Sequence, residues 1–294
     1  MIEFRDLIQA GLHFGHQKSR WCPKMAPYIW GHRNGVHLID VSKIAFNLEK
    51  AANFLESVAA KGETILWVGT KKSAKTMIES IGQNLNMPYV NHRWLGGTIT
   101  NFYQVKKAVT KYLHLEDVIK KADESSYTKK ECVTFQKAAD RLKRTVGGLI
   151  ELKMPIGAIV LIDVKKEATA LQEAVAAGVP VVALVDSNAD PMGVDFVIPG
   201  NDDSPKAIKL VLDYLAASAA RGLDKKNLQD EAEAIAQASD MAAKKASAKN
   251  NAHAKQQPAG VKKPVNLFEQ KLAIAEKQEE LAKALAEELE AEKQ

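Results

Sequence analysis

Short apolar runs alternate with amphipathic stretches along most of the first 220 residues. Runs bounded by turn residues at 64–69, 88–91, 157–163, 180–186 and 194–198 predict buried strands, because a parallel sheet is covered on both faces. Apolar positions at the helical period predict helices at 40–62, 73–85, 167–177 and 204–220. With right-handed crossovers, this alternation predicts an α/β fold. We expect a flavodoxin-like three-layer α/β/α sandwich of about five parallel strands, formed by residues 38–101 and 153–222.

Residues 102–152 interrupt this alternation, because they contain no strand signal. Phe102, Val105, Val109 and Tyr112 follow helical spacing, and a second apolar seam of the same kind runs from 135 to 152. We expect an antiparallel helical coiled-coil hairpin inserted into the sandwich, with its turn at residues 123–126.

The two ends of the chain have a different composition from the sandwich. In residues 1–37, basic and aromatic side chains alternate with Gly and Pro, which predicts an extended N-terminal arm rather than a regular helix. Residues 223–294 are rich in Ala, Lys and Glu. We expect a linker over 224–257 and a polar helix over 265–292 that depends on a partner.

The positive charge belongs to the body of the chain. Residues 224–294 hold 12 Lys and 13 acidic residues, which leaves 29 basic against 23 acidic residues before them. A basic body is compatible with a polyanionic partner. Cys22 and Cys132 lack the spacing of a zinc site and are expected to be free thiols. Without an apolar signal region or a long apolar run, the chain is expected to be cytoplasmic and to have no membrane contact.

The stretch Asn91-His92-Arg93-Trp94-Leu95-Gly96-Gly97 joins a predicted strand to the hairpin. Arg93 could hold a phosphate and Trp94 could stack on a base, although Trp94 could equally fill the core. The glycines allow positive φ or a close approach, and Thr98, Thr100 and Asn101 could cap the next helix. The candidate RNA-binding residues lie in the arm, at this junction and on the hairpin: Lys18, Arg20, Trp21, Lys24, Arg33, Arg93, Trp94, Lys106, Lys107, Lys111, Arg141 and Arg144.

Two groups of residues could hold a metal ion, but neither is predicted to do so. His13 and His16 lack a third ligand nearby, so structural histidines are expected. The acidic segment 186–203 falls at the usual ligand edge of such a sheet, which permits an ion. Its Asp residues are also good turn formers and helix caps, and that role is the one we expect. We predict no metal and no cofactor.

A nucleotide-binding loop is the alternative. Gly69-Thr70-Lys71-Lys72-Ser73-Ala74-Lys75-Thr76 follows the P-loop pattern except at Ala74, and Asp163 ends a later strand as a magnesium ligand would. The Cβ of Ala74 disfavours wrapping of the backbone around a phosphate. Because no catalytic base is evident either, we do not expect an enzyme.

Three long motifs carry a resemblance to a known family. Residues 10–17, residues 21–31 and the stretch from Asn91 to Gly97 resemble the bacterial ribosomal proteins that stand second in the small-subunit numbering. Residues 186–203 are similar as well, and the resemblance covers about residues 1–222. The tail is longer than is usual in the family.

The resemblance implies a ribonucleoprotein role in translation without catalytic activity. It implies a flavodoxin-like domain with a coiled-coil insertion, bound to 16S rRNA between the head and body of the 30S subunit. It also implies neighbouring small-subunit proteins as partners, among them the large mRNA-binding protein that is first in the numbering, whose docking would support assembly and initiation.

Overall fold

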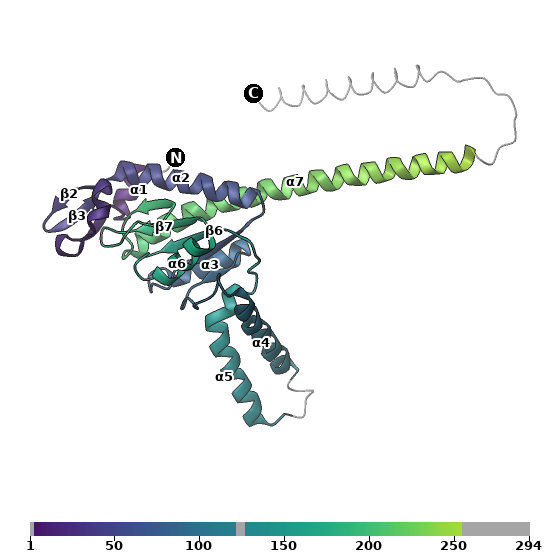
Figure 1. The fold of residues 1–294 in the computed structure, drawn as a ribbon, viewed down its shortest axis with the longest axis horizontal. Coiled ribbons are helices and arrows are strands. Elements are labelled where there is room, and N and C mark those ends of the chain that lie inside the picture. The colour runs from purple at the N-terminus through teal and green to yellow at the C-terminus, as the bar shows by residue number, and fades with distance from the viewer. Residues whose placement is uncertain (1–2, 122–126, 255–294) are drawn as a thin grey trace, which may run out of the picture. The chain divides into compact units, whose positions relative to one another are not determined.

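The computed structural model describes residues 3–121 and 127–254, and side chains up to residue 230. The chain divides into two compact units, Met1–Glu233 and Ala234–Gln294. The sandwich, the hairpin and the N-terminal region all belong to the first unit (Figure 1).

The centre of the first unit is a five-stranded parallel sheet with the order β5-β4-β6-β7-β8. Its strands are β4 (Thr64–Val68), β5 (Tyr89–Val90), β6 (Ile156–Ile162), β7 (Val181–Val185) and β8 (Phe196–Pro199). Pairing is parallel throughout this sheet, for example between Val160 and Val182. This is the flavodoxin-like strand order, so the predicted fold class is confirmed.

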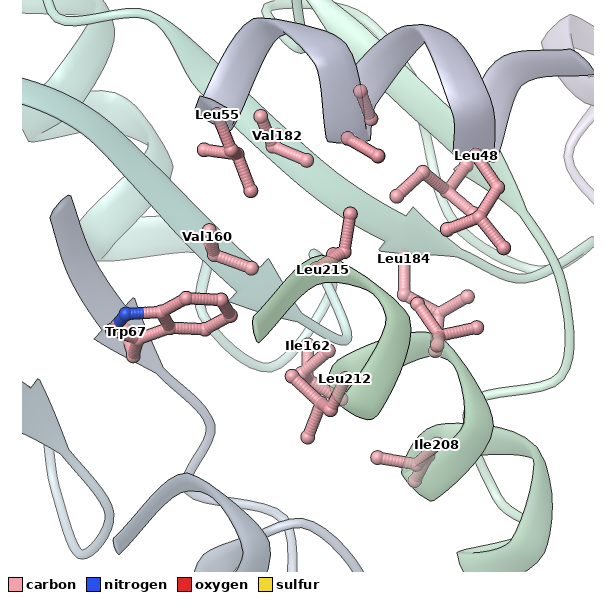
Figure 2. Close-up of a cluster of buried hydrophobic side chains, with 14 of the residues drawn as sticks. Leu48, Leu55, Trp67, Val160, Ile162, Val182, Leu184, Ile208, Leu212 and Leu215 are labelled. Carbon is pink, nitrogen blue, oxygen red and sulfur yellow. The ribbon is translucent and has the colours of Figure 1, made fainter. Parts of the chain in front are cut away.

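Alternate residues of the strands enter two separate cores. The side chains on one face of the sheet include Trp67, Val160, Ile162, Val182 and Leu184. There they pack against α2 (Val41–Ala60), α3 (Lys75–Leu85) and the first part of α7 (Pro205–Ala254). Figure 2 shows this core, with leucines of α2 and α7 meeting over the strands. Because every strand has both faces covered, its sequence is an unbroken apolar run.

The second core lies on the opposite face of the sheet. Leu66, Leu161 and Ala183 point into it, together with Ala170 and Ala174 of α6 (Ala168–Ala177). Val105, Leu149 and Leu152, which come from the root of the hairpin, complete this core. The insertion is therefore anchored in the sandwich rather than merely tethered to it.

The predicted helical hairpin is formed by α4 (Phe102–Lys120) and α5 (Lys129–Val146) (Figure 1). Val109 and Tyr112 of α4 pack against Val146 of α5 in a small separate cluster. A capping box starts α5, because the Thr128 side chain accepts from the Glu131 N–H and the Glu131 carboxylate accepts from the Thr128 N–H. The turn predicted at residues 123–126 lies outside the described residues.

The N-terminal region is not the extended arm that the sequence predicted. It contains α1 (Phe4–Gln9) and a three-stranded antiparallel sheet of order β1-β3-β2, formed by β1 (Phe14–Gln17), β2 (Ile29–Arg33) and β3 (Val36–Ile39). Asn34 and Gly35 connect β2 to β3, both with positive φ. Asn-Gly is the preferred pair for such a two-residue turn, so the hairpin could have been predicted from that dipeptide.

The linker expected from residue 224 is also corrected, because α7 continues as one helix to Ala254. Ala, Lys, Glu and Gln are strong helix formers, and the composition that suggested a linker suits a helix equally well. The polar helix expected at 265–292 lies outside the described residues. Within the described ranges, no helix has the combination of length and hydropathy that a membrane-spanning segment needs.

Candidate nucleic-acid interface

The junction loop (residues 91–101) is held in place by one buried carboxylate on α6. Oε1 of Glu173 accepts hydrogen bonds from Nε1 of Trp94 at 3.0 Å and from the backbone N–H of Gly97 at 2.8 Å. Its Oε2 accepts from the backbone N–H groups of Ile99 and Thr100 at 3.1 and 3.4 Å. Gly97 has a φ of +89°, which a side chain would disfavour. A single side chain thus fixes both the backbone of the loop and the Trp94 ring.

These hydrogen bonds keep Glu173 charged. Burial alone raises the pKa of its carboxyl, but the donors from Trp94, Gly97, Ile99 and Thr100 outweigh that effect and bring the pKa below its usual range. Glu173 was not among the residues predicted from the sequence. A signal was present, because it shares the inward face of an otherwise alanine-rich helix with Ala170 and Ala174.

Trp94 is part of the second core, with 8% of its surface exposed. The ring therefore has no open face for a base. The predicted stacking on RNA does not fit this position, whereas the alternative role of Trp94 as a core-filling side chain does. Arg93, the preceding residue, is exposed. The predicted side-chain caps of α4 are not formed either. Asn101 stands at the N-cap position without a side-chain bond, and the Thr98 hydroxyl donates to the Leu95 carbonyl at 2.6 Å.

The hairpin carries the largest set of predicted basic residues, and all of them are exposed. Three lie on α4 and two on α5, and none forms an ion pair with any residue that the structure describes. Uncompensated cations on a projecting element attract phosphate over the range of a Debye length. The five predicted basic residues of the hairpin are Lys106, Lys107, Lys111, Arg141 and Arg144.

The second group of predicted residues lies around the three-stranded sheet. Lys18 and Arg20 are exposed in a short 3₁₀ helix (Lys18–Arg20), and Arg33 is exposed at the end of β2. The Trp21 ring is 37% exposed and lies 5.2 Å from that of His37. Lys24 differs from the others, because its ammonium pairs with Asp190 at 2.6 Å. It would have to exchange that partner for a phosphate.

The carboxyl edge of the parallel sheet is acidic instead. The acidic cluster consists of Asp163, Asp186, Asp202 and Asp203 together with two basic side chains, His16 and Lys71. The Lys71 ammonium lies 2.6 Å from Asp203, 2.9 Å from Asp202 and 3.5 Å from Asp163. His16 of β1 contacts Asp186 through Nδ1 at 2.9 Å and Asp203 through Nε2 at 3.3 Å. Carboxylates therefore outnumber basic groups in this cluster, and Arg20 lines the same hollow as His16, Asp186 and Asp203.

The charged groups of the acidic cluster shift one another's pKa values. The hydrogen bond to Asp186 raises the pKa of His16, against the effect of burial. Burial, reinforced by the Asp163 carboxyl, raises the pKa of Asp202 to about 6. The ammonium of Lys71 lowers the pKa of Asp203. Although burial opposes it, the pKa of Lys71 is raised by Asp203 and Asp202. Lys71 is thus the positive centre on which these carboxylates depend.

Other residues of segment 186–203 act as the sequence predicted. Asp190 accepts from the Met192 N–H at 3.0 Å, and Asn201 accepts from the Asp203 N–H at 2.8 Å, as turn-forming residues do. His16, Asp186 and Asp202 each offer a possible metal-ligand atom, and these atoms lie within 4.8 Å of one another. The ammonium of Lys71 already supplies positive charge to this group.

The P-loop alternative does not fit the geometry of residues 69–76. The Thr70 N–H donates to the Glu167 carboxylate at 3.1 Å, and the N–H groups of Ala74 and Lys75 donate to the Lys71 carbonyl at 2.9 and 3.1 Å. These amides are not free for a phosphate. Ala74 is fully buried, and the proposed magnesium ligand Asp163 lies beside the Lys71 ammonium.

Comparisons with known proteins agree with one another. The family model described as Ribosomal protein S2 matches residues 7–222, which include the junction loop, the hairpin and the acidic cluster. The small ribosomal subunit protein uS2 of Geotalea uraniireducens is 42% identical over 228 residues, covering 78% of this chain and 89% of the relative. The proteins of the same name from Amoebophilus asiaticus and Rhodopseudomonas palustris (strain HaA2) are both 41% identical. The alignments cover 78% and 75% of this chain, and 74% and 67% of those relatives.

Proposed function

Because the chain belongs to the ribosomal protein S2 family, and is thus a structural constituent of the small ribosomal subunit and not an enzyme, we propose that it binds 16S rRNA directly through its exposed basic surfaces. The observation that carries this proposal is the exposed basic surface of the α4–α5 hairpin, whose five predicted contact residues form no ion pair with any residue that the structure describes. A second contact comes from Lys18, Arg20, Trp21, Lys24 and Arg33 around the three-stranded sheet, and a third from Arg93.

The charge distribution supports this choice of surface. Asp163, Asp186, Asp202 and Asp203 gather negative charge at one edge of the sheet, so RNA is expected to reach this side only through the basic residues beside the cluster, such as Arg20. The hairpin, in contrast, holds 12 basic against 7 acidic residues between positions 103 and 153. Trp94 contributes indirectly, because its hydrogen bond to Glu173 fixes the loop that presents Arg93.

We also propose that the chain supports assembly and translation initiation by helping to dock the large mRNA-binding protein that is first in the small-subunit numbering. The support for this partner is the family resemblance. Binding of 16S rRNA does not depend on it.

Replacing Lys106, Lys107 and Lys111 together with alanine is expected to weaken binding of the chain to 16S rRNA and to flatten its salt dependence. Each phosphate that is no longer neutralised removes roughly 0.7 to 0.9 from the slope of log K against log salt, so the slope of the triple variant should fall by about 2 to 3. Filter binding over a range of KCl concentrations measures the slope.

The matched control replaces Lys61, Lys206 and Lys209, which are exposed lysines outside the proposed surface. This variant has the same net charge as the first and should keep most of the slope. Equal losses in the two variants would mean that the chain attracts RNA only through its overall charge.

A further inference from the structure

One face of α4 combines an exposed aromatic ring with basic side chains. Tyr103, Lys106, Lys107, Thr110, Lys111 and His114 surround a shallow hollow on this face, three or four residues apart along the helix. The opposite face of α4 carries Val105, Val109 and Tyr112, which are buried. The aromatic residue is therefore not needed for packing of the hairpin.

Tyr103 stands out among these residues. Its side chain is 66% exposed, and it belongs to none of the hydrophobic clusters formed by the described residues. The Lys107 ammonium lies over its ring, 4.4 Å from the centroid. One face of the ring is thus close to a positive charge, while the high exposure leaves the remainder open to a planar partner.

We infer that Tyr103 stacks on an unpaired RNA base, while Lys106, Lys107 and Lys111 hold the adjoining phosphates. This inference rests on the proposed binding of 16S rRNA and assigns one contact within it. A duplex offers phosphates but keeps its bases stacked inside, so only an unpaired nucleotide uses both the ring and the lysines.

Charge favours RNA as the occupant of this face. Residues 102–115 contain no Asp or Glu, and the first acidic residue of α4 is Glu116. A protein partner would have to be strongly acidic and present a flat group to the ring. RNA supplies both features in each nucleotide.

Tyr103→Ala is expected to weaken binding of a fluorescent oligoadenylate strand by about fivefold or more, because a base–aromatic stack contributes at least that much. Tyr103→Phe keeps the ring and should bind like the unmodified chain. Binding of a duplex RNA of the same length should be unchanged in both variants, whereas Lys107→Ala should weaken binding of both RNAs. Fluorescence anisotropy with the full chain measures all of these affinities.

Phe46→Ala is the matched control, because Phe46 is exposed to a similar degree, 69%, but lies on α2 away from these lysines. It should not change either affinity. Equal binding of oligoadenylate by Tyr103→Ala and the unmodified chain would overturn the stacking contact. If the unmodified chain still bound 16S rRNA in that case, the proposed function would stand. Absence of 16S rRNA binding by the unmodified chain would overturn both.

Discussion

Replacing Glu173 with alanine is expected to lower the free energy of unfolding by about 3 to 4 kcal/mol, because several buried donors lose their acceptor at once. The indole N–H of Trp94 and the N–H groups of Gly97 and Ile99 all donate to this carboxylate within 3.1 Å. Leaving such groups unpaired inside a protein costs more than the hydrogen bonds contribute when formed. Urea unfolding followed by Trp fluorescence would measure the loss.

Two variants make this prediction specific. Glu173→Gln keeps the shape and one acceptor oxygen, so its loss should be smaller than that of the alanine variant. Gln172→Ala changes an exposed neighbour on the same helix and should stay within about 0.5 kcal/mol of the unmodified chain. A loss below about 1 kcal/mol in Glu173→Ala would show that water replaces the carboxylate as the acceptor for the loop.

Replacing Lys71 with methionine is expected to cost about 2 to 4 kcal/mol at neutral pH, because the carboxylates around it lose their central positive charge. The Lys71 side chain is 19% exposed, so solvent screens part of the effect, whereas that of Asp202 is 2% exposed. Without Lys71, the pKa of Asp202 should rise further above its present value of about 6.

The pH dependence of the free energy of unfolding follows from these pKa shifts. A carboxyl whose pKa is raised on folding favours the folded state at acid pH and penalises it as pH rises through that value. The stability difference between the unmodified chain and Lys71→Met should therefore be largest near neutral pH and shrink as the carboxylates take up protons. Thermal unfolding between acid and neutral pH checks this. A difference that stays constant over that range would contradict the electrostatic explanation.

Adding Asp202→Asn to Lys71→Met removes one of the uncompensated charges. It should therefore restore part of the stability at neutral pH. Lys72→Met is a matched control, because Lys72 is exposed and forms no ion pair with any residue that the structure describes. A surface substitution of this kind should stay within about 0.5 kcal/mol of the unmodified chain.

The parallel sheet could be predicted because its strands carry a local signal. Each is an apolar run whose alternate residues enter the two cores, as Trp67 and Leu66 do, and each helix keeps a regular apolar period. The hairpin insertion was predictable for the same reason. Local signals also explain the two errors in the predicted fold, at the N-terminal region and after residue 224. Gly and Pro in residues 1–37 concealed a small sheet, and the Ala-rich composition after residue 224 suits a linker and a helix alike.

The side chains that organise the junction loop and the sheet edge could not be predicted in this way. Glu173 is 79 positions from Trp94, and Lys71 is 131 positions from Asp202. Such contacts depend on how the strands are ordered in space, which the local pattern does not specify. The exposed cations were easier to identify, because a charged residue on the polar face of a predicted helix is expected to face solvent.

The most direct test of the account is a cryo-EM map of small ribosomal subunits that contain this chain. We expect density for the five-stranded sandwich against 16S rRNA, with the basic faces of α4 and α5 and the basic residues around the three-stranded sheet close to phosphates. A chain that is absent from small subunits prepared at low salt, or whose hairpin and three-stranded sheet make no contact with 16S rRNA, would contradict the account.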